Sequence, residues 1–202
     1  VKAIKEGREI YDNIKKYLTY LLRCNVMEIL VMFIVMVGVP YLAGSQGHEP
    51  GSVVALTAIQ LLWINLTTDG LPALALGVDP GDPDLMDRKP RSPNESVFSR
   101  DVKIYLTAAP ILMTVLLLTG YLMYQPWLGP AQLLEARTQL LTAMMLMELV
   151  NAISARSLKY PVFKVGVFKN RFLWYAILSS LGLQLMVLYL SLIHISEPTR
   201  PY

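Results

Sequence analysis

The chain has 202 residues, of which 54% are hydrophobic and 16% are charged, and its mean hydropathy is +0.44. These proportions argue against an ordinary soluble globular domain. The net charge of +3 is too small to indicate a nucleic-acid-binding protein, and a single cysteine, Cys24, excludes a cysteine-based zinc site and an internal disulfide.

Residues 1–16 are predicted to form a cytoplasmic stalk helix that continues into the first apolar stretch. No proline interrupts the chain before Pro40, and Gly7 costs a helix only about 1 kcal/mol. Opposite charges stand four residues apart, a spacing that brings side chains together on a helix. The expected ion pairs are Lys2 with Glu6, Lys5 with Glu9, and Asp12 with Lys16.

Residues 17–190 contain five apolar stretches, at 17–39, 53–76, 104–124, 140–155 and 172–190. A bilayer-spanning helix needs about 20 mostly apolar residues, because each residue adds about 1.5 Å across a hydrocarbon core of about 30 Å. The fourth stretch is the shortest, and it spans only if Arg137 and Arg156 extend toward water at its two ends. The pattern predicts an all-α fold, a polytopic membrane helix bundle with about five transmembrane helices in a lipid bilayer.

The basic residues are distributed unevenly between the connections. Most of the 18 Lys and Arg lie before the first stretch, between the second and third, and between the fourth and fifth, whereas residues 40–52 contain none. Basic connections stay on the cytoplasmic side of a membrane. The distribution therefore predicts a multi-pass membrane protein with the amino terminus of the chain in the cytoplasm.

The connection 77–101 is predicted to be a turn-rich cytoplasmic loop, because several prolines and aspartates alternate within it. The aspartates lack the glycine and the terminal glutamate that an EF-hand calcium loop requires, so a metal site is not expected there. The residues in question are Pro80, Pro83, Pro90 and Pro93 with Asp79, Asp82, Asp84 and Asp87.

Three acidic residues fall well within the apolar stretches: Glu28 in the first, Asp69 in the second and Glu148 in the fourth. A carboxylate at the centre of a membrane helix costs about 2.5–3.5 kcal/mol on insertion scales, so it normally faces a partner, a cavity or an ion path. No Lys or Arg lies at a matching depth, since Arg23 is more than one turn nearer to the cytoplasm than Glu28. The three carboxylates must therefore be protonated or share a bound cation.

Other oxygen-bearing side chains stand three or four residues from these acids, and so lie on the same helix face. A hard cation such as calcium binds about six to eight oxygen atoms from carboxylates, amides, hydroxyls and backbone carbonyls. The pattern therefore predicts an intramembrane cation site. The neighbours are Asn25 near Glu28, Asn65 and Thr68 near Asp69, and Asn151 near Glu148.

Gly70 and Pro72 directly follow Asp69. Glycine weakens a helix and proline removes a backbone donor, so carbonyls in residues 66–71 are expected to leave helical bonding and point toward an ion. Irregular backbone at this depth is tolerated only where it is buried or lines a cavity. A simple kink for helix packing is the alternative.

Three motifs stand in order along the chain. Residues 60–73 read QLLWINLTTDGLPA, residues 86–93 read MDRKPRSP, and upstream are EGR at 6–8, IYDN at 10–13 and NVME at 25–28. Together they resemble P-type calcium pumps of the sarco/endoplasmic reticulum type, in the sixth transmembrane helix, the cytoplasmic loop after it, and the fifth helix with its stalk. The resemblance runs from residue 1 to about residue 189, and it implies that the five stretches are the fifth to ninth helices of a ten-helix membrane domain.

The resemblance also implies a set of calcium ligands. One calcium site would use Asn25, Glu28, Thr68, Asp69 and Glu148. A second would use Asn65 and Asp69, together with ligands on a fourth helix that this chain lacks. In pumps of this family, ATP phosphorylates an aspartate in a cytoplasmic domain, and domain movements then switch the ion sites between the two sides of the membrane.

Neither the Asp-Lys-Thr-Gly phosphorylation motif nor the Gly-Asp-Gly motif of that family occurs in these residues. The resemblance therefore implies no catalytic and no cofactor-binding residue in this chain, which we do not expect to hydrolyse ATP alone. Calcium would be the transported ion, and ATP and magnesium would act only through the missing amino-terminal part of the same pump. Residues 1–16 would act as a lever, and loop 77–101 would contact the phosphorylation domain.

Other functions compatible with the sequence are a P-type pump for sodium, manganese or protons, an ion channel, and an ion-coupled carrier. A carrier often contains internal repeats, and none is visible between the stretches. A purely structural membrane scaffold would leave three buried carboxylates unexplained.

Residues 190–200, LSLIHISEPTR, do not continue the family pattern. They resemble the translation of a transposase adapter used to prepare sequencing libraries. We therefore expect residues 191–202 to derive from adapter DNA, and we assign no function to His194, Glu197 and Arg200. A genuine short polar tail is the alternative.

Overall fold

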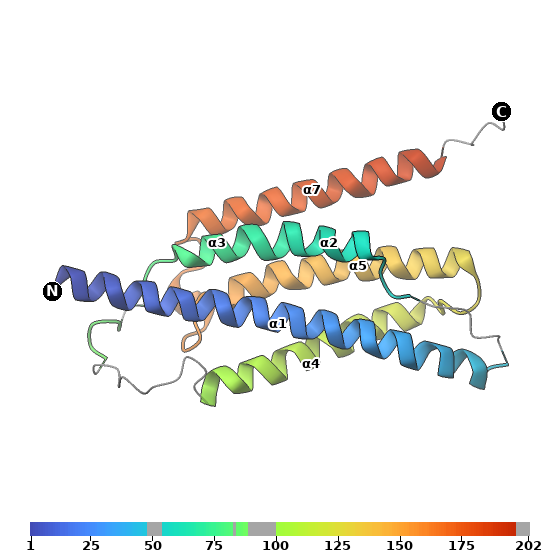
Figure 1. Ribbon diagram of the computed structural model, residues 1–202. Coiled ribbons are helices and arrows are strands. Elements are labelled where there is room, and N and C mark those ends of the chain that lie inside the picture. Colours follow the sequence, from blue (N-terminus) through green and yellow to red (C-terminus); the bar gives the residue numbers. More distant parts are fainter. Residues whose placement is uncertain (48–53, 83, 89–99, 197–202) are drawn as a thin grey trace.

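A computed structural model describes residues 1–47, 54–82, 84–88 and 100–196. All regular elements in these residues are helices, and the long ones lie lengthwise beside one another in one bundle (Figure 1). The predicted all-α membrane helix bundle is thereby confirmed. The helices are α1 (Lys2–Ser45), α2 (Ala58–Ile64), η1 (Asn65–Gly70), α3 (Leu71–Gly77), α4 (Arg100–Met123), α5 (Pro130–Ser154), α6 (Val162–Val165) and α7 (Arg171–Ser196).

Three helices of the described residues are long and apolar enough to cross a membrane: α1, residues Val102–Met123 of α4, and residues Arg171–Tyr189 of α7. The other two predicted spans are not among these helices. The second is divided among α2, η1 and α3, and α5 has polar residues along its 25-residue length. Both nevertheless pack within the same bundle as the three apolar helices (Figure 1).

Helix α1 joins the predicted stalk and the first predicted span without a break, as the absence of proline before residue 40 indicates. Its residues Met27, Val31, Val35 and Val39 are four apart and form one buried stripe. This stripe packs with residues of α4 and α5 that include Leu117 and Met144. A second buried cluster, nearer the amino terminus of α1, joins α1 with α3, α5 and α7.

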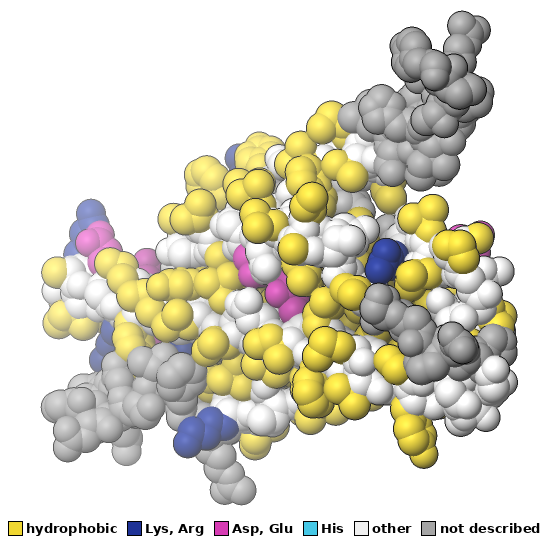
Figure 2. Space-filling view, turned by 45° about the vertical axis from the view of Figure 1, so that its right-hand side comes forward, with side chains coloured by type: hydrophobic (Ala, Val, Ile, Leu, Met, Phe, Trp, Pro, Cys, Tyr) yellow, Lys and Arg dark blue, Asp and Glu magenta, His cyan; other side chains and the backbone are white. Residues whose placement is uncertain are grey.

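The outer faces of the helices are apolar as well. Ile29, Phe33 and Met36 of α1 are 66%, 59% and 63% exposed. Figure 2 shows hydrophobic side chains over much of one face of the molecule. Such an extended apolar surface suits contact with lipid rather than with water.

The end of α3 and the connection after it lie at the end of the bundle that also contains the amino terminus and the start of α7 (Figure 1). The prolines, basic residues and serine at 89–93 in the predicted loop 77–101 lie outside the described residues, as do Pro83 and residues 197–202. The origin of residues 191–202 therefore stays a prediction.

Candidate cation site

The second predicted span is broken at η1, a six-residue π-helix between α2 and α3. π-Helical turns are rare and are frequently found at functional sites. Gly70 is the last residue of η1, and Pro72 follows in the first turn of α3. The break predicted from these two residues is confirmed, and it places Asn65, Thr68 and Asp69 within η1.

Two hydroxyl groups from other helices bind the backbone of η1. Pro72 has no N–H, and it stands where a π-helical donor to Thr67 or an α-helical donor to Thr68 would be. Tyr20 of α1 donates its hydroxyl to the carbonyl oxygen of Thr68 at 2.7 Å, and Ser180 of α7 donates to that of Thr67 at 2.6 Å. The expectation that freed carbonyls point toward an ion is therefore wrong for these two.

Glu148 of α5 contacts η1 directly. Its side chain is fully buried, and its Oε2 lies 2.5 Å from Thr68 Oγ1, which also lies 2.7 Å from the carbonyl oxygen of Ile64. A hydroxyl carries one hydrogen, so it donates to one of these two oxygens at a time. When Thr68 donates to Ile64, the Glu148 carboxylate faces a hydroxyl lone pair, an arrangement that suits a shared cation.

Several buried oxygens around η1 have no hydrogen-bond partner in the described part of the chain. They are Glu28 Oε1, Asn65 Oδ1, Asp69 Oδ1 and Glu148 Oε1. Glu148 interacts electrostatically with Glu28 and Asp69, and Glu28 also interacts with Asp69 and Asn65. Acidic side chains are visible near the middle of the face in Figure 2, with apolar side chains on either side. Buried carboxylates without a basic partner are unfavourable, and a cation would stabilise them.

The structure brings five of the six predicted ligands together around η1, and Asn25 is the exception. Asn25 is exposed, and its side-chain amide donates to the carbonyl oxygen of Leu21 in its own helix at 2.9 Å. Within the described residues, no three His, Cys, Asp or Glu side chains are close enough to hold one metal ion. The carboxylates are thus neighbours without the spacing of a closed coordination shell.

Asn151, predicted to share a face with Glu148, has a different contact. Its amide donates to the sulfur of Cys24 at 3.3 Å, and both residues are buried. Arg23, next to Cys24, is also buried and donates to Ser154 Oγ at 3.1 Å. These contacts join α1 to α5, and none of them involves a side chain of the candidate cation site.

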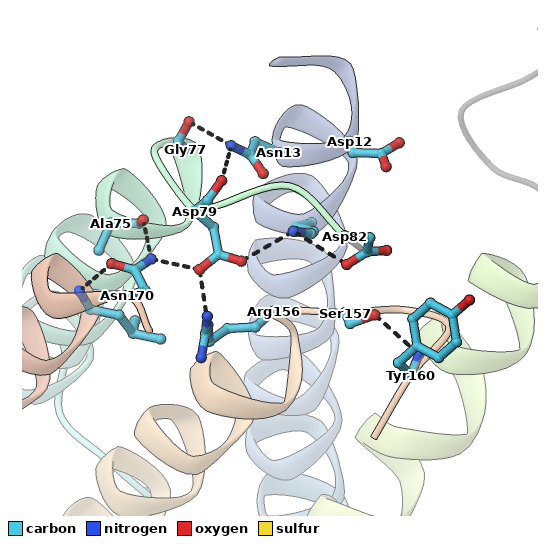
Figure 3. A network of polar contacts seen from close by, with 12 residues as sticks. Asp12, Asn13, Ala75, Gly77, Asp79, Asp82, Arg156, Ser157, Tyr160 and Asn170 are labelled. Carbon is cyan, nitrogen blue, oxygen red and sulfur yellow. Dashed lines mark hydrogen bonds and ion pairs between the residues drawn. The ribbon is translucent and has the colours of Figure 1, made fainter. Parts of the chain in front are cut away.

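A second polar cluster, missed by the sequence analysis, lies where the amino-terminal part of α1 meets the end of α3. Its centre is Asp79, whose side chain is fully buried. Asp79 Oδ2 accepts from Lys16 Nζ at 3.1 Å, and Oδ1 accepts from Arg156 Nε at 2.9 Å and from Asn170 Nδ2 at 2.7 Å (Figure 3). We call Lys16, Asp79, Arg156 and Asn170 the Asp79 network.

The Asp79 network also fixes the backbone around it. Asn13 of α1 donates to the carbonyl oxygens of Gly77 and Asp79 at 3.2 and 2.7 Å (Figure 3). Asn170 donates to that of Ala75 at 2.9 Å and accepts from the N–H of Leu173 at 3.0 Å, so it caps the start of α7. The end of α3 is therefore held by both α1 and α7.

Arg156 differs from its prediction, which had it extend toward water. Its side chain is fully buried, and besides Asp79 it contacts the carbonyl oxygens of Gly166 and Val167 at 2.7 and 2.9 Å. A buried guanidinium needs an anionic partner and acceptors for its hydrogens, and the fold supplies Asp79 and two carbonyl oxygens, whereas Nη2 has no hydrogen-bond partner among the described residues. Arg156 therefore links α5, the connection after α3 and the segment before α7.

Comparison with known proteins matches residues 53–200 to the family described as "Cation transporting ATPase, C-terminus". The chain belongs to this family. Among its relatives are the calcium-transporting ATPase of Bacillus subtilis strain 168, 39% identical over 188 residues, and calcium-transporting ATPase 1 of Bacillus cereus, 33% identical over 202 residues. Calcium-transporting ATPase 1 of Yarrowia lipolytica is 32% identical over 192 residues.

These alignments cover 93%, 93% and 94% of the chain but only 19%, 21% and 19% of the relatives. The chain thus spans about a fifth of the length of the calcium-transporting ATPases it matches. It corresponds to a carboxy-terminal membrane region of P-type calcium ATPases, as the resemblance implied.

In this ATPase region, the aspartates after α3 bind basic side chains. Arg88 lies 2.7 Å from Asp12, 2.7 Å from Asp82 and 2.6 Å from Asp84, and Lys159 lies 2.5 Å from Asp84. Hydrogen bonds from Arg88 and Lys159 hold the pKa of the Asp84 carboxyl well below its usual range. The hydrogen bond with Asp84 likewise raises the pKa of Arg88. The aspartates that contact these cations therefore act as ion-pair partners.

The stalk pairs are confirmed in part. Lys2 and Glu6 lie 4.0 Å apart, and Lys5 and Glu9 lie 3.8 Å apart. The third pair is wrong, because Asp12 binds Arg88 and Lys16 binds Asp79. Partners from the connection after α3 have displaced the local pairing that helix spacing alone predicts.

The link made by Asp84 is expected to persist in mild acid. Its pKa is depressed, so the stabilisation is fully present above the ordinary aspartate pKa of about 3.9 and is lost as the pH falls through the lower folded value. Limited proteolysis at pH 7 and pH 5 should therefore cleave the wild type slowly within residues 84–88 at both values, and Asp84→Asn faster at both. Glu6→Gln, which removes an exposed pair, should match wild type. If the wild type is cleaved faster at pH 5 than at pH 7, while a control substrate is not, the prediction is contradicted.

Proposed function

We propose that this chain is the carboxy-terminal membrane part of an ATP-driven calcium pump of the sarco/endoplasmic reticulum type, and that it holds the transported ion. The unpartnered buried oxygens around η1 carry the proposal. Most belong to carboxylates, the oxygen ligands that calcium prefers. The names of the relatives, which are calcium-transporting ATPases, support calcium as the ion.

The proposed ligands are Glu28, Asn65, Thr68, Asp69 and Glu148. The acids are not close enough for one ion in the described arrangement, so Glu28 and Asp69 must move toward Glu148 when calcium binds. Side-chain rotation and small helix shifts are the motions that would bring the acids together. Asn25 would join the site only if its side chain left Leu21 and α1 turned.

The same proposal assigns the coupling to α1. We place the amino terminus of the chain in the cytoplasm, with residues 1–16 as the lever and loop 77–101 as the contact for the phosphorylation domain. Helix α1 carries Asn13 and Lys16, which bind the connection after α3, and also Glu28 at the site. A shift of this continuous helix would therefore move Asn13 and Lys16 together with Glu28.

ATP and magnesium would act through the amino-terminal part of the same pump, because the phosphorylation motif is absent from these 202 residues. The spans would be the fifth to ninth helices of the complete membrane domain. A second calcium ion would then be bound by Asn65 and Asp69 together with ligands on another helix of the pump.

The proposal is tested with the full-length pump that carries this chain, reconstituted in vesicles. ATP hydrolysis and radioactive calcium uptake are measured while calcium, sodium, manganese and pH are varied separately. We expect micromolar calcium to stimulate hydrolysis and uptake together. Stimulation by sodium, manganese or protons without calcium would favour a pump for that cation, and ATP-independent flux would favour a channel or carrier.

A further inference from the structure

Helix α7 contacts the broken span at two points that match in register. Ser180 donates to the carbonyl oxygen of Thr67 at 2.6 Å, and Trp63 Nε1 donates to Gln184 Oε1 at 3.0 Å. Ser180 and Gln184 are four residues apart and share one face of α7, and Trp63 and Thr67 are four apart on the opposing segment. The two segments run antiparallel, so the contacts lie one helical turn apart (Figure 1).

The Ser180–Thr67 contact is buried, and the Trp63–Gln184 contact is partly buried. Thr67 is 2% exposed, Ser180 is fully buried and Gln184 is 4% exposed. The buried position of the Ser180–Thr67 contact keeps water away, so losing the Ser180 hydroxyl would leave the Thr67 carbonyl without this donor in an apolar environment. The hydroxyls of Ser180 and Tyr20 bind the two carbonyl oxygens, those of Thr67 and Thr68, to which Pro72 has no N–H to donate.

The π-helical turn determines which way Thr68 and Asp69 face. Relaxing a π-turn to an α-turn shifts the register by one residue, which rotates the following side chains by about 100° around the helix axis. Thr68 would then leave Glu148, which it contacts at 2.5 Å in the described structure. The π-turn therefore has to be held for the oxygens of η1 and α5 to face one ion.

We propose that Ser180 is a positioning residue of the cation site: by binding the Thr67 carbonyl it holds the π-turn that presents Thr68 to Glu148. Gln184 supports the same contact one turn away through Trp63. Neither residue touches the ion. The inference rests on the proposed function and extends the site from α1, η1 and α5 to α7.

The test compares Ser180→Ala with Ser179→Ala in the full-length pump. Ser179 is the exposed neighbour and provides the matched control. Ser180→Ala should raise the calcium concentration for half-maximal ATP hydrolysis about five-fold, the effect of losing roughly one net hydrogen bond. The maximal rate at saturating calcium should stay within about two-fold of wild type, because the ion, once bound, restores the turn. Ser179→Ala should match wild type.

A second comparison, made in the Thr68→Val variant, distinguishes a positioning role of Ser180 from a general loss of stability. In Thr68→Val, the contact with Glu148 is already lost, so adding Ser180→Ala should shift the calcium dependence by less than about two-fold. An additive shift in that background, equal calcium dependence of Ser180→Ala and Ser179→Ala, or a lower maximal rate without any calcium shift would each overturn the inference. A wild-type pump without calcium dependence would instead overturn the proposed function.

Discussion

Asp69→Asn should raise the calcium concentration needed for half-maximal ATP hydrolysis by on the order of 100-fold in the full-length pump, and Glu148→Gln should do the same. Each substitution keeps the shape of the side chain and removes one negative charge. Both residues contribute a buried oxygen without a hydrogen-bond partner beside η1. A buried cation that loses one of its anionic partners is left undercompensated, which is why a large effect is expected.

The matched control for Glu148→Gln is Glu135→Gln on the same helix. Glu135 is exposed near the start of α5, far along the helix from Glu148. It should leave the calcium dependence within about two-fold of wild type, as surface substitutions usually do. Calcium dependence that is unchanged in both Asp69→Asn and Glu148→Gln would remove these residues from the site.

Asn25→Ala distinguishes the ligand set implied by the family resemblance from the one that the described geometry supports. The Asn25 amide is exposed and bonded within α1, so the geometry predicts a shift smaller than that of Asp69→Asn. A shift of equal size would mean that α1 turns Asn25 into the site when calcium binds. Calcium titration of ATP hydrolysis measures both variants under one set of conditions.

The part of the site predicted from sequence is the part with a local cause. Carboxylates in an apolar stretch need a partner wherever the helices pack, and Gly70 with Pro72 disrupts a helix in any surroundings. The groups that bind the freed carbonyls are distant in the sequence, and for that reason they were not predicted. Tyr20 and Ser180 are polar residues within apolar spans, and this is the one signal that could have identified them, but their partners depend on how three helices pack.

The Asp79 network shows the same limit more clearly. Lys16, Arg156 and Asn170 are separated from Asp79 by 63, 77 and 91 residues along the chain. Helix spacing paired Lys16 with Asp12 because it considers only neighbours within a turn. The fully buried Asp79 offers Lys16 a stronger partner than the partly exposed Asp12 one turn away, which itself binds Arg88.

Removing Asp79 should destabilise the protein strongly. Breaking a buried ion pair by deleting one partner typically costs about 3–5 kcal/mol, because the other charge stays buried and unpaired. Asp79→Ala is therefore expected to lower the thermal unfolding temperature of the full-length protein in detergent, measured by loss of its monomeric fraction on heating. Asp84→Asn, which alters a partly exposed pair, should have a much smaller effect.

The double variant Asp79→Asn/Arg156→Met tests whether the charge, rather than the volume, is responsible. Lys16 also lies 4.0 Å from Asp82, so Asp82 can still compensate Lys16 when Asp79 is neutral. Arg156 has no other acidic partner among the described residues, and its other hydrogen bonds there go to the carbonyl oxygens of Gly166 and Val167. Neutralising both Asp79 and Arg156 should therefore recover much of the stability lost in Asp79→Asn. If the double variant loses as much stability as the two single variants together, the two charges do not compensate each other. Shape and hydrogen bonding would then hold α3 to α1 and α7.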